Sequence, residues 1–138
     1  MEHYPVYLSL RDKRVLVVGT RECALAKLRL LMKTPARIEV YGFDPIDDLI
    51  ALSAAGHIHL MHRKLDANDL TSAQLVYAAQ EDDALDHAVA QLAREHGVLV
   101  NIVDNLRHSD FITPAIVDRS PITIAIGTEG GGPYWPAR

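Results

Sequence analysis

One short apolar run restricts the possible fold more than any other feature of the sequence. Residues 14–19 read RVLVVG, so four consecutive apolar side chains stand between Arg14 and Gly19. A strand that is apolar on both of its faces is typical of a sheet covered by helices on both sides. A helical pattern follows over residues 23–33, with an apolar face that includes Leu28 and Leu31. The start of the chain therefore predicts a strand, a tight turn and a helix of an α/β fold.

The same alternation continues for about a hundred residues. We expect further strands at residues 5–10, 37–41, 57–61, 75–79 and 98–103, and further helices at residues 46–54 and 83–96. Gly56 and Gly97 follow the ends of these two helices, as is common at helix C-termini. The series predicts an α/β fold, a Rossmann-like doubly wound parallel sheet.

The pattern changes in the last part of the chain. Residues 111–117 and 122–126 are apolar runs with no helix between them, and we expect them to pair as antiparallel strands. We therefore divide the chain into a Rossmann-like dinucleotide-binding domain, residues 1–111, and the truncated start of a dimerisation region, residues 112–138. Two strands with no further partner indicate association with a second copy.

Composition excludes several classes of protein. The formal net charge is −4 and no basic run is present, which does not favour nucleic-acid binding. Cys23 is the single cysteine, so neither an intramolecular disulfide nor a cysteine-only zinc site can form. No apolar run approaches the roughly 20 residues of a membrane-spanning helix, and no signal peptide is visible. We expect a cytoplasmic protein that does not bind membranes.

The turn after residues 14–19 is a candidate nucleotide site. It reads Gly19-Thr20-Arg21-Glu22-Cys23-Ala24. A dinucleotide site needs a glycine for the turn, a second glycine where backbone approaches the pyrophosphate, and a small residue for helix packing. Gly19 and Ala24 meet the first and third needs, but Arg21 stands at the second. Its side chain would crowd the phosphates unless it turns outward and binds phosphate itself.

Asp44 is the candidate for the acid that binds the adenine ribose. It lies just after the predicted strand at residues 37–41, roughly 20 residues beyond the glycine turn as such sites require. An aspartate there could equally cap the helix expected from Ile46. Both interpretations stay open at this point.

Asp104 is the candidate for acid–base chemistry. It follows Asn101-Ile102-Val103 at the carboxyl end of the last buried strand, which is the edge where open α/β sheets bind ligands. A carboxylate there can transfer protons, although Asp104-Asn105 is also typical of a simple turn.

The histidines indicate a metal site only weakly. His57 and His59 would share one face of a strand, with His62 nearby, but no further ligand stands at matching spacing. We therefore predict no metal site. His108 lies four residues beyond Asp104 and could reach the same cleft.

Three segments together resemble the N-terminal region of the siroheme synthase family. They are YPVYLSLRDKRVLVVG, ALAKLRLLMKTPARIEVYG and NIVDNLRHSDFITPAIVDRSPITIAI. The resemblance implies two activities: NAD-dependent oxidation of precorrin-2 to sirohydrochlorin, and insertion of Fe²⁺ as a sirohydrochlorin ferrochelatase. It implies that Asp104 acts in both, that tetrapyrroles are the substrates, and that the protein is a homodimer.

The resemblance also implies which residues bind cofactor and substrate. The expected NAD-binding residues are Gly19, Thr20, Arg21, Glu22, Cys23, Phe43, Asp44 and Ala79. The expected substrate-binding residues are Asn101, Asn105, His108 and Thr128.

The chain departs from the family pattern at three places. The family has a glycine triplet in the first turn, Ala-Ala-Thr-Asp where this chain has Ala78-Ala79-Gln80-Glu81, and Ser-Ser-Gly-Gly where it has Gly127-Thr128-Glu129-Gly130. Two of these places lie where the cofactor should bind. A homologue that binds tetrapyrroles or inserts metal without NAD is therefore the alternative to the dehydrogenase.

Overall fold

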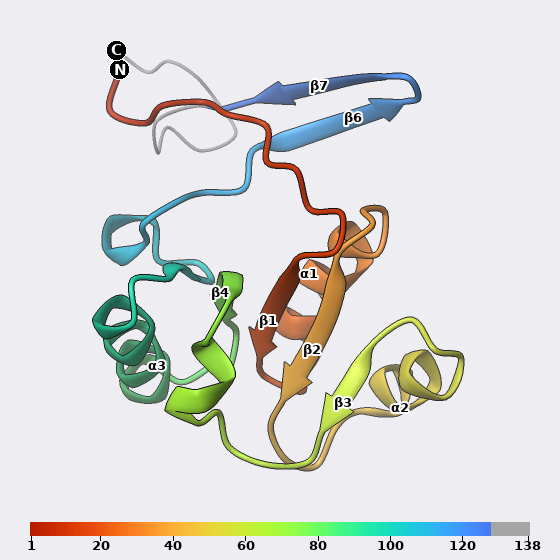
Figure 1. Ribbon diagram of the computed structural model, residues 1–138, viewed down its shortest axis with the longest axis vertical. Coiled ribbons are helices and arrows are strands. Elements are labelled where there is room, and N and C mark those ends of the chain that lie inside the picture. The colour runs from red at the N-terminus through yellow and green to blue at the C-terminus, as the bar shows by residue number, and fades with distance from the viewer. Residues whose placement is uncertain (128–138) are drawn as a thin grey trace.

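The computed structural model describes residues 1–127 as a parallel sheet with helices, followed by a separate hairpin (Figure 1). The strands are β1 (Arg14–Val18), β2 (Arg37–Tyr41), β3 (His59–Met61), β4 (Ala73–Ala78), β5 (Leu99–Ile102), β6 (Ala115–Arg119) and β7 (Ile122–Ile126). The helices are α1 (Glu22–Leu31), α2 (Asp47–Ala54) and α3 (Asp83–Glu95), with short 3₁₀ helices η1 (Ala67–Leu70) and η2 (Leu106–His108). The parallel sheet has the order β3-β2-β1-β4-β5, whereas β6 and β7 pair antiparallel. The predicted fold class is confirmed.

The position of β1 in the middle of the sheet explains why its sequence is continuously apolar. Val15 and Val17 pack into one core with Leu28 of α1 and Leu49 of α2. The alternate side chains of β1 pack into a second core on the other face, together with alanines of α3. Because successive side chains of a strand point to opposite faces, a strand buried on both faces needs an apolar residue at every position.

The prediction of a strand at residues 5–10 is wrong. This segment pairs with no strand, and Val6 and Tyr7 are exposed. It passes beside the hairpin instead (Figure 1), where the Tyr7 hydroxyl donates a hydrogen bond to the Thr123 carbonyl at 3.0 Å. Apolar composition suits a strand, but only a free sheet edge in register can make one.

The first hairpin strand begins four residues later than predicted, because the residues before it pack on the parallel sheet. The Phe111 ring meets the Tyr77 ring edge-on, with centroids 5.4 Å apart. The hydroxyls of Tyr77 and Thr113 are hydrogen-bonded at 3.1 Å. Residues 111–113 therefore contact the first domain, and the domain boundary after residue 111 stays a prediction.

A buried glutamate organises the amino end of the sheet. Glu39 of β2 is 4% exposed, and the Arg14 guanidinium donates to both of its carboxylate oxygens, at 3.0 and 2.8 Å. The Tyr41 hydroxyl donates to Glu39 Oε1 at 2.8 Å. The hydrogen bonds from Arg14 hold the pKa of Glu39 below its usual range, against the opposing effect of burial. Arg14 also donates to the carbonyls of Thr71 and Asp69, so the pair ties the strands to the segment before β4.

Exchange of Arg14 for methionine is expected to lower the free energy of unfolding by about 1–3 kcal/mol at neutral pH, because it leaves a buried carboxylate with fewer donors. The pKa of Glu39 is lowered on folding, so its stabilising contribution is present above the ordinary pKa of 4.5 and is lost as pH falls through the folded value. Urea unfolding should therefore show the difference at pH 7 shrinking in strong acid. Arg29→Met, which removes an exposed pair with Asp48 at 3.9 Å, is the control and should change little. Equal losses in both variants would contradict this account.

Candidate functional site

The loops after three neighbouring strands meet at the carboxyl edge of the parallel sheet. The Ala79 amide donates to the Val18 carbonyl at 2.8 Å, and the Val103 amide donates to the Ala78 carbonyl at 3.0 Å. The strand order reverses direction at β1 and β4, and ligands of open α/β sheets bind at this switch point. The edge therefore holds the ends of β1, β4 and β5 side by side.

Gly19 makes the turn after β1, as predicted. Its φ is +149°, and a Cβ at this position would stand 2.0 Å from the Ala79 carbonyl oxygen. No other residue type fits this approach of the turn to the end of β4. The turn directs the N-terminus of α1 toward the carboxyl edge.

The loop after β2 is fastened to the same turn. The Thr20 hydroxyl donates to the Phe43 carbonyl at 2.8 Å, and the Ile46 amide donates to the Thr20 carbonyl at 3.1 Å. Asp44 follows Phe43, is exposed, and has a φ of +49°. The N-cap of α2 is Ile46, and no side chain caps that helix, so the interpretation of Asp44 as its cap is wrong. The role of Asp44 toward a ribose stays a prediction.

The start of α1 carries the unusual residues of the glycine turn. Arg21 is the N-cap, exposed and extended at φ −114°, and its side chain makes no capping hydrogen bond. The backbone at Arg21 therefore does not itself require glycine. The Cys23 amide donates to Glu81 Oε2 at 3.2 Å, which brings the loop after β4 onto the first turn of α1.

Asp104 lies in the position that the acid–base hypothesis requires. It is exposed, with a φ of +62°, directly after β5. Burial raises the pKa of the Cys23 thiol, and the charges of Glu81 and Asp104 raise it further. Asp104 also forms a turn, because the Asn105 amide donates to the Ile102 carbonyl at 2.9 Å. The turn interpretation therefore holds, and the acid–base role of Asp104 stays a prediction.

Three of the four residues expected to bind substrate lie within the described part of the chain, and each makes a different contact. Asn101 is 7% exposed, and its amide nitrogen donates to the Phe111 carbonyl at 2.9 Å, so it holds residue 111 against the sheet. Asn105 Oδ1 accepts a hydrogen bond from the His108 amide at 3.3 Å, which shapes η2. The His108 ring contacts the His87 ring of α3, with centroids 5.2 Å apart. Thr128 lies outside the described residues, and all four roles stay predictions.

Two residues after β4 were not identified from the sequence as site residues. Asp86 of α3 is 4% exposed, and its Oδ1 accepts hydrogen bonds from the Gln80 amide at 3.0 Å and the Gln80 side chain at 3.1 Å. Burial raises the pKa of Asp86 against the effect of these bonds. Glu81, the residue directly after Gln80, has a φ of +61°. For Glu81 the available signal was its position just beyond the predicted strand at residues 75–79, whereas Asp86 lies within the helix α3 and gave no such signal.

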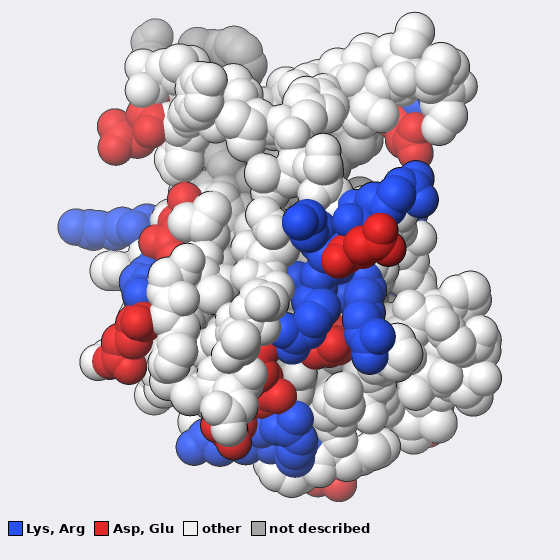
Figure 2. All heavy atoms as spheres, in the orientation of Figure 1, with Lys and Arg blue, Asp and Glu red and all other residues white. Residues whose placement is uncertain are grey.

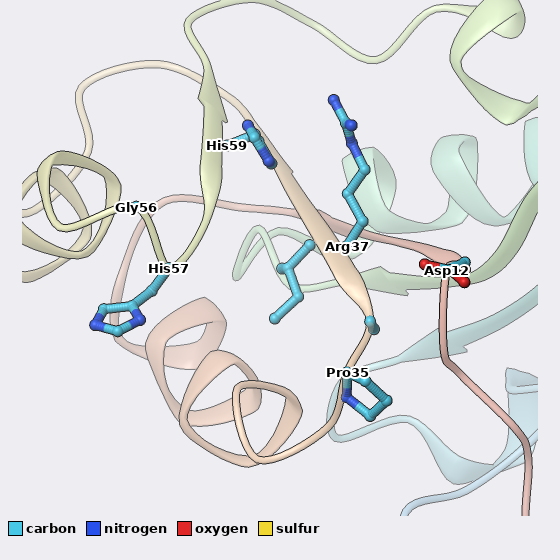
Figure 3. A pocket seen from close by; sticks show the side chains of 8 residues that line it. Asp12, Pro35, Arg37, Gly56, His57 and His59 are labelled. Carbon is cyan, nitrogen blue, oxygen red and sulfur yellow. The ribbon is translucent and has the colours of Figure 1, made fainter.

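A hollow of about 430 Å³ lies at the opposite, amino edge of the sheet (Figure 3). Arg37, His57 and His59 are among its lining residues, and Figure 2 shows Lys and Arg side chains gathered over the amino ends of β1 and β2. His57 precedes β3 and points away from His59, so the prediction that they share a strand face is wrong. Within residues 1–127, no three His, Cys, Asp or Glu side chains are grouped to hold a metal. The carboxyl edge stays the candidate site, because the Gly19 turn and the loops after β4 and β5 meet there.

The fold and this edge define a class: a Rossmann-like domain whose glycine turn directs a helix N-terminus toward a ligand. A family model described as "Putative NAD(P)-binding" matches residues 6–115, and the chain belongs to that family. None of the described helices is both long and apolar enough to span a membrane.

Two curated relatives carry the same name. The chain is 40% identical over 133 residues to a siroheme synthase of Methylococcus capsulatus and 39% identical to one of Pseudoalteromonas atlantica. The alignments cover 96% of this chain but 28% and 29% of the relatives, so the chain spans under a third of their length. Among solved structures, the precorrin-2 dehydrogenase SirC is similar in fold, with a TM-score of 0.79 at 24% identity, covering 95% of this chain and 64% of that one.

Proposed function

We propose that this chain is the nucleotide-binding part of a precorrin-2 dehydrogenase, which oxidises precorrin-2 to sirohydrochlorin during siroheme formation. The alignment with siroheme synthases along nearly the whole chain supports this proposal. The observation that carries it is the exposed Asp104 carboxylate at the carboxyl edge, directly after Val103, whose amide donates to the Ala78 carbonyl at the end of β4. A carboxylate at this edge can accept a proton from a substrate that lies next to a nucleotide.

The residues at the edge fit a dinucleotide. Gly19 lets the turn approach β4 where a Cβ would not, and this approach aims the amides of α1 at the edge. Asp44 follows β2, where an acid binds the adenine ribose in such folds. We assign the cofactor to contacts with Gly19, Thr20, Arg21, Glu22, Cys23, Phe43, Asp44 and Ala79. When bound, the nicotinamide ring supplies the hydride acceptor.

Asp104 moves the proton of this oxidation. Removal of two hydrogens from precorrin-2 takes away one hydride and one proton, and the Asp104 carboxylate accepts the proton. Because the side chain is exposed, it can then release that proton to solvent. Asn101, Asn105, His108 and Thr128 remain our candidates for binding the tetrapyrrole.

The proposal is tested by adding precorrin-2 and NAD⁺ to the protein without oxygen and following absorbance. The expected result is formation of sirohydrochlorin together with an equal amount of NADH. Sirohydrochlorin formation that is indifferent to NAD⁺, or no formation while the tetrapyrrole binds, would reject the dehydrogenase in favour of a protein that binds tetrapyrroles without the nucleotide.

We also propose that Fe²⁺ is a substrate at the same edge, in a ferrochelatase reaction. The supporting observation is again the exposure of Asp104, since metal insertion needs a base to accept the two pyrrole protons that the metal replaces. Sirohydrochlorin mixed with Fe²⁺ and the protein should show the absorbance change of metal insertion without added NAD⁺. A rate equal to that of protein-free solution would reject this second activity.

We propose further that the protein is a homodimer joined through the hairpin. Ile122, Ile124 and Ile126 share one face of β7 and are 63%, 51% and 50% exposed, opposite Val117 of β6. Such a continuous apolar face is typical of an interface.

Ile124→Asp is expected to convert the dimer to a monomer, because it places a charge in the middle of this face. Sedimentation velocity measures the change. Ala125→Asp places the same charge on the other face of the hairpin and should leave the dimer intact. Dissociation of both variants alike, or of neither, would contradict the proposed interface.

A further inference from the structure

We propose that the Glu81 carboxylate competes with the nucleotide's phosphates for the N-terminus of α1, so that the protein binds NAD only when this side chain swings away. The inference rests on the proposed function and concerns Glu81, which lies in the second of the three departures from the family pattern. It makes Glu81 a determinant of nucleotide affinity that the glycine turn alone does not reveal.

The contact itself is the first support. The first amides of an α-helix have no partners within the helix, and in dinucleotide folds they bind the pyrophosphate. Here the Leu25 amide already donates to the Arg21 carbonyl at 3.0 Å. The Cys23 amide donates to Glu81 Oε2 at 3.2 Å. An anion from the chain itself therefore occupies an amide that a bound phosphate would use.

The loop that carries Glu81 is held in place. Gln80 bonds twice to the buried Asp86 carboxylate, through its amide and through its side chain. The preceding Ala79 is fixed by its hydrogen bond to Val18 and by its contact with the Gly19 turn. Glu81 then adopts a left-handed backbone at φ +61°, which aims it back at α1. Its side chain is exposed, so it can rotate away while the backbone stays.

The other carboxylates near the first turn of α1 also oppose the binding of a phosphate. Burial raises the pKa of the Cys23 thiol most, and the negative charges of Glu81, Asp104 and Asp86 raise it further. Glu22 adds a fourth carboxylate in that turn. A pyrophosphate brought to this turn is repelled by these charges, to an extent that depends on solvent screening.

The experiment compares three variants by calorimetry. Glu81→Asn removes the charge and shortens the side chain, and asparagine tolerates the left-handed backbone. Glu81→Asp keeps the charge but shortens the reach. Asp12→Asn removes an exposed charge from a residue with a similar φ of +62°, but at the amino edge away from the Cys23 amide, and serves as the matched control. NAD⁺ and inorganic pyrophosphate are titrated separately, and hydrogen exchange of the Cys23 amide reports the contact without any ligand.

We expect Glu81→Asn to tighten NAD⁺ and pyrophosphate binding roughly tenfold and to speed exchange of the Cys23 amide. Glu81→Asp should give a smaller gain, and Asp12→Asn no gain. Equal affinities for the natural chain and Glu81→Asn, equal gains in Asp12→Asn and Glu81→Asn, or no change in exchange would each overturn the competition.

The two proposals fail in different ways. Pyrophosphate binding that strengthens in Glu81→Asn while NAD⁺ binds to no variant supports the competition and rejects the nucleotide-dependent function. If NAD⁺ binds and substitution of Glu81 does not change its affinity, the competition is rejected and the proposed function is not. Absence of binding by either ligand to every variant rejects both.

Discussion

Asp104→Asn is expected to lower the rate of precorrin-2 oxidation by about a hundredfold or more, without unfolding the protein. The amide matches the carboxylate in size but cannot accept the substrate proton, and loss of general acid–base catalysis typically has an effect of about 10²–10⁴-fold. Asparagine tolerates the φ of +62° at this position. Because Asp104 is exposed, the free energy of unfolding should change little.

Asp12→Asn is the matched control for this experiment. Asp12 has the same φ of +62° and is also exposed, but it lies in the turn before β1, at the amino edge. Initial rates, substrate binding and urea unfolding are measured for both variants. Unchanged oxidation in Asp104→Asn, with both variants folded, would refute the catalytic assignment. If the ferrochelatase proposal is also correct, metal insertion falls in parallel with oxidation.

Gly19→Ala is expected to lower the free energy of unfolding by roughly 3 kcal/mol or more, the largest effect on stability that we predict. The added Cβ would meet the Ala79 carbonyl oxygen at 2.0 Å, where backbone rather than a movable side chain must shift, and the φ of +149° is strained for alanine. The turn also positions α1, so NAD⁺ binding should weaken in the fraction that stays folded.

Gly56→Ala separates the two causes of this effect. Gly56 also has a positive φ, +84°, but no atom lies within 4 Å of the added Cβ. Its exchange should therefore lower stability only by the backbone strain, about 1 kcal/mol. Urea unfolding of both variants measures the difference. Similar losses would show that the close approach at Gly19 is relieved by a small backbone movement.

The two edges of the sheet have separate roles. The amino edge holds Arg14 and the buried Glu39, whose pairing stabilises the fold. The carboxyl edge holds the exposed carboxylates of Glu81 and Asp104 near the N-terminus of α1. Parallel strands place all their carboxyl ends at one edge, so loops distant in sequence contribute to one site.

Most of the architecture could be predicted from local patterns. The bounds of β2 and β7 match the prediction at every residue, and α3 differs by one residue at its end. These elements have strong periodicity and clear stop signals. The segment at residues 5–10 has apolar residues too, but it became no strand, because pairing depends on a partner edge that local sequence does not describe.

The site was predicted in part. Gly19 and Asp104 were identified because a turn requirement and a strand end are both visible locally. Glu81 was seen as a departure from a family pattern but not as a contact of Cys23, which lies 58 residues earlier. The choice between two roles for Asp44 needed the position of the α2 N-cap.

The amino-acid sequence alone determined that the sheet is parallel and covered on both faces, since burial periodicity acts between near neighbours. It also identified Gly19 as the turn, but the close approach to Ala79 that excludes a Cβ there belongs to the tertiary structure. Only the tertiary structure decided which charges meet. The pairing of Arg14 with Glu39 and the contact of Glu81 with Cys23 each join residues from different strands and loops. Such contacts depend on strand order and register, which arise when the whole sheet assembles.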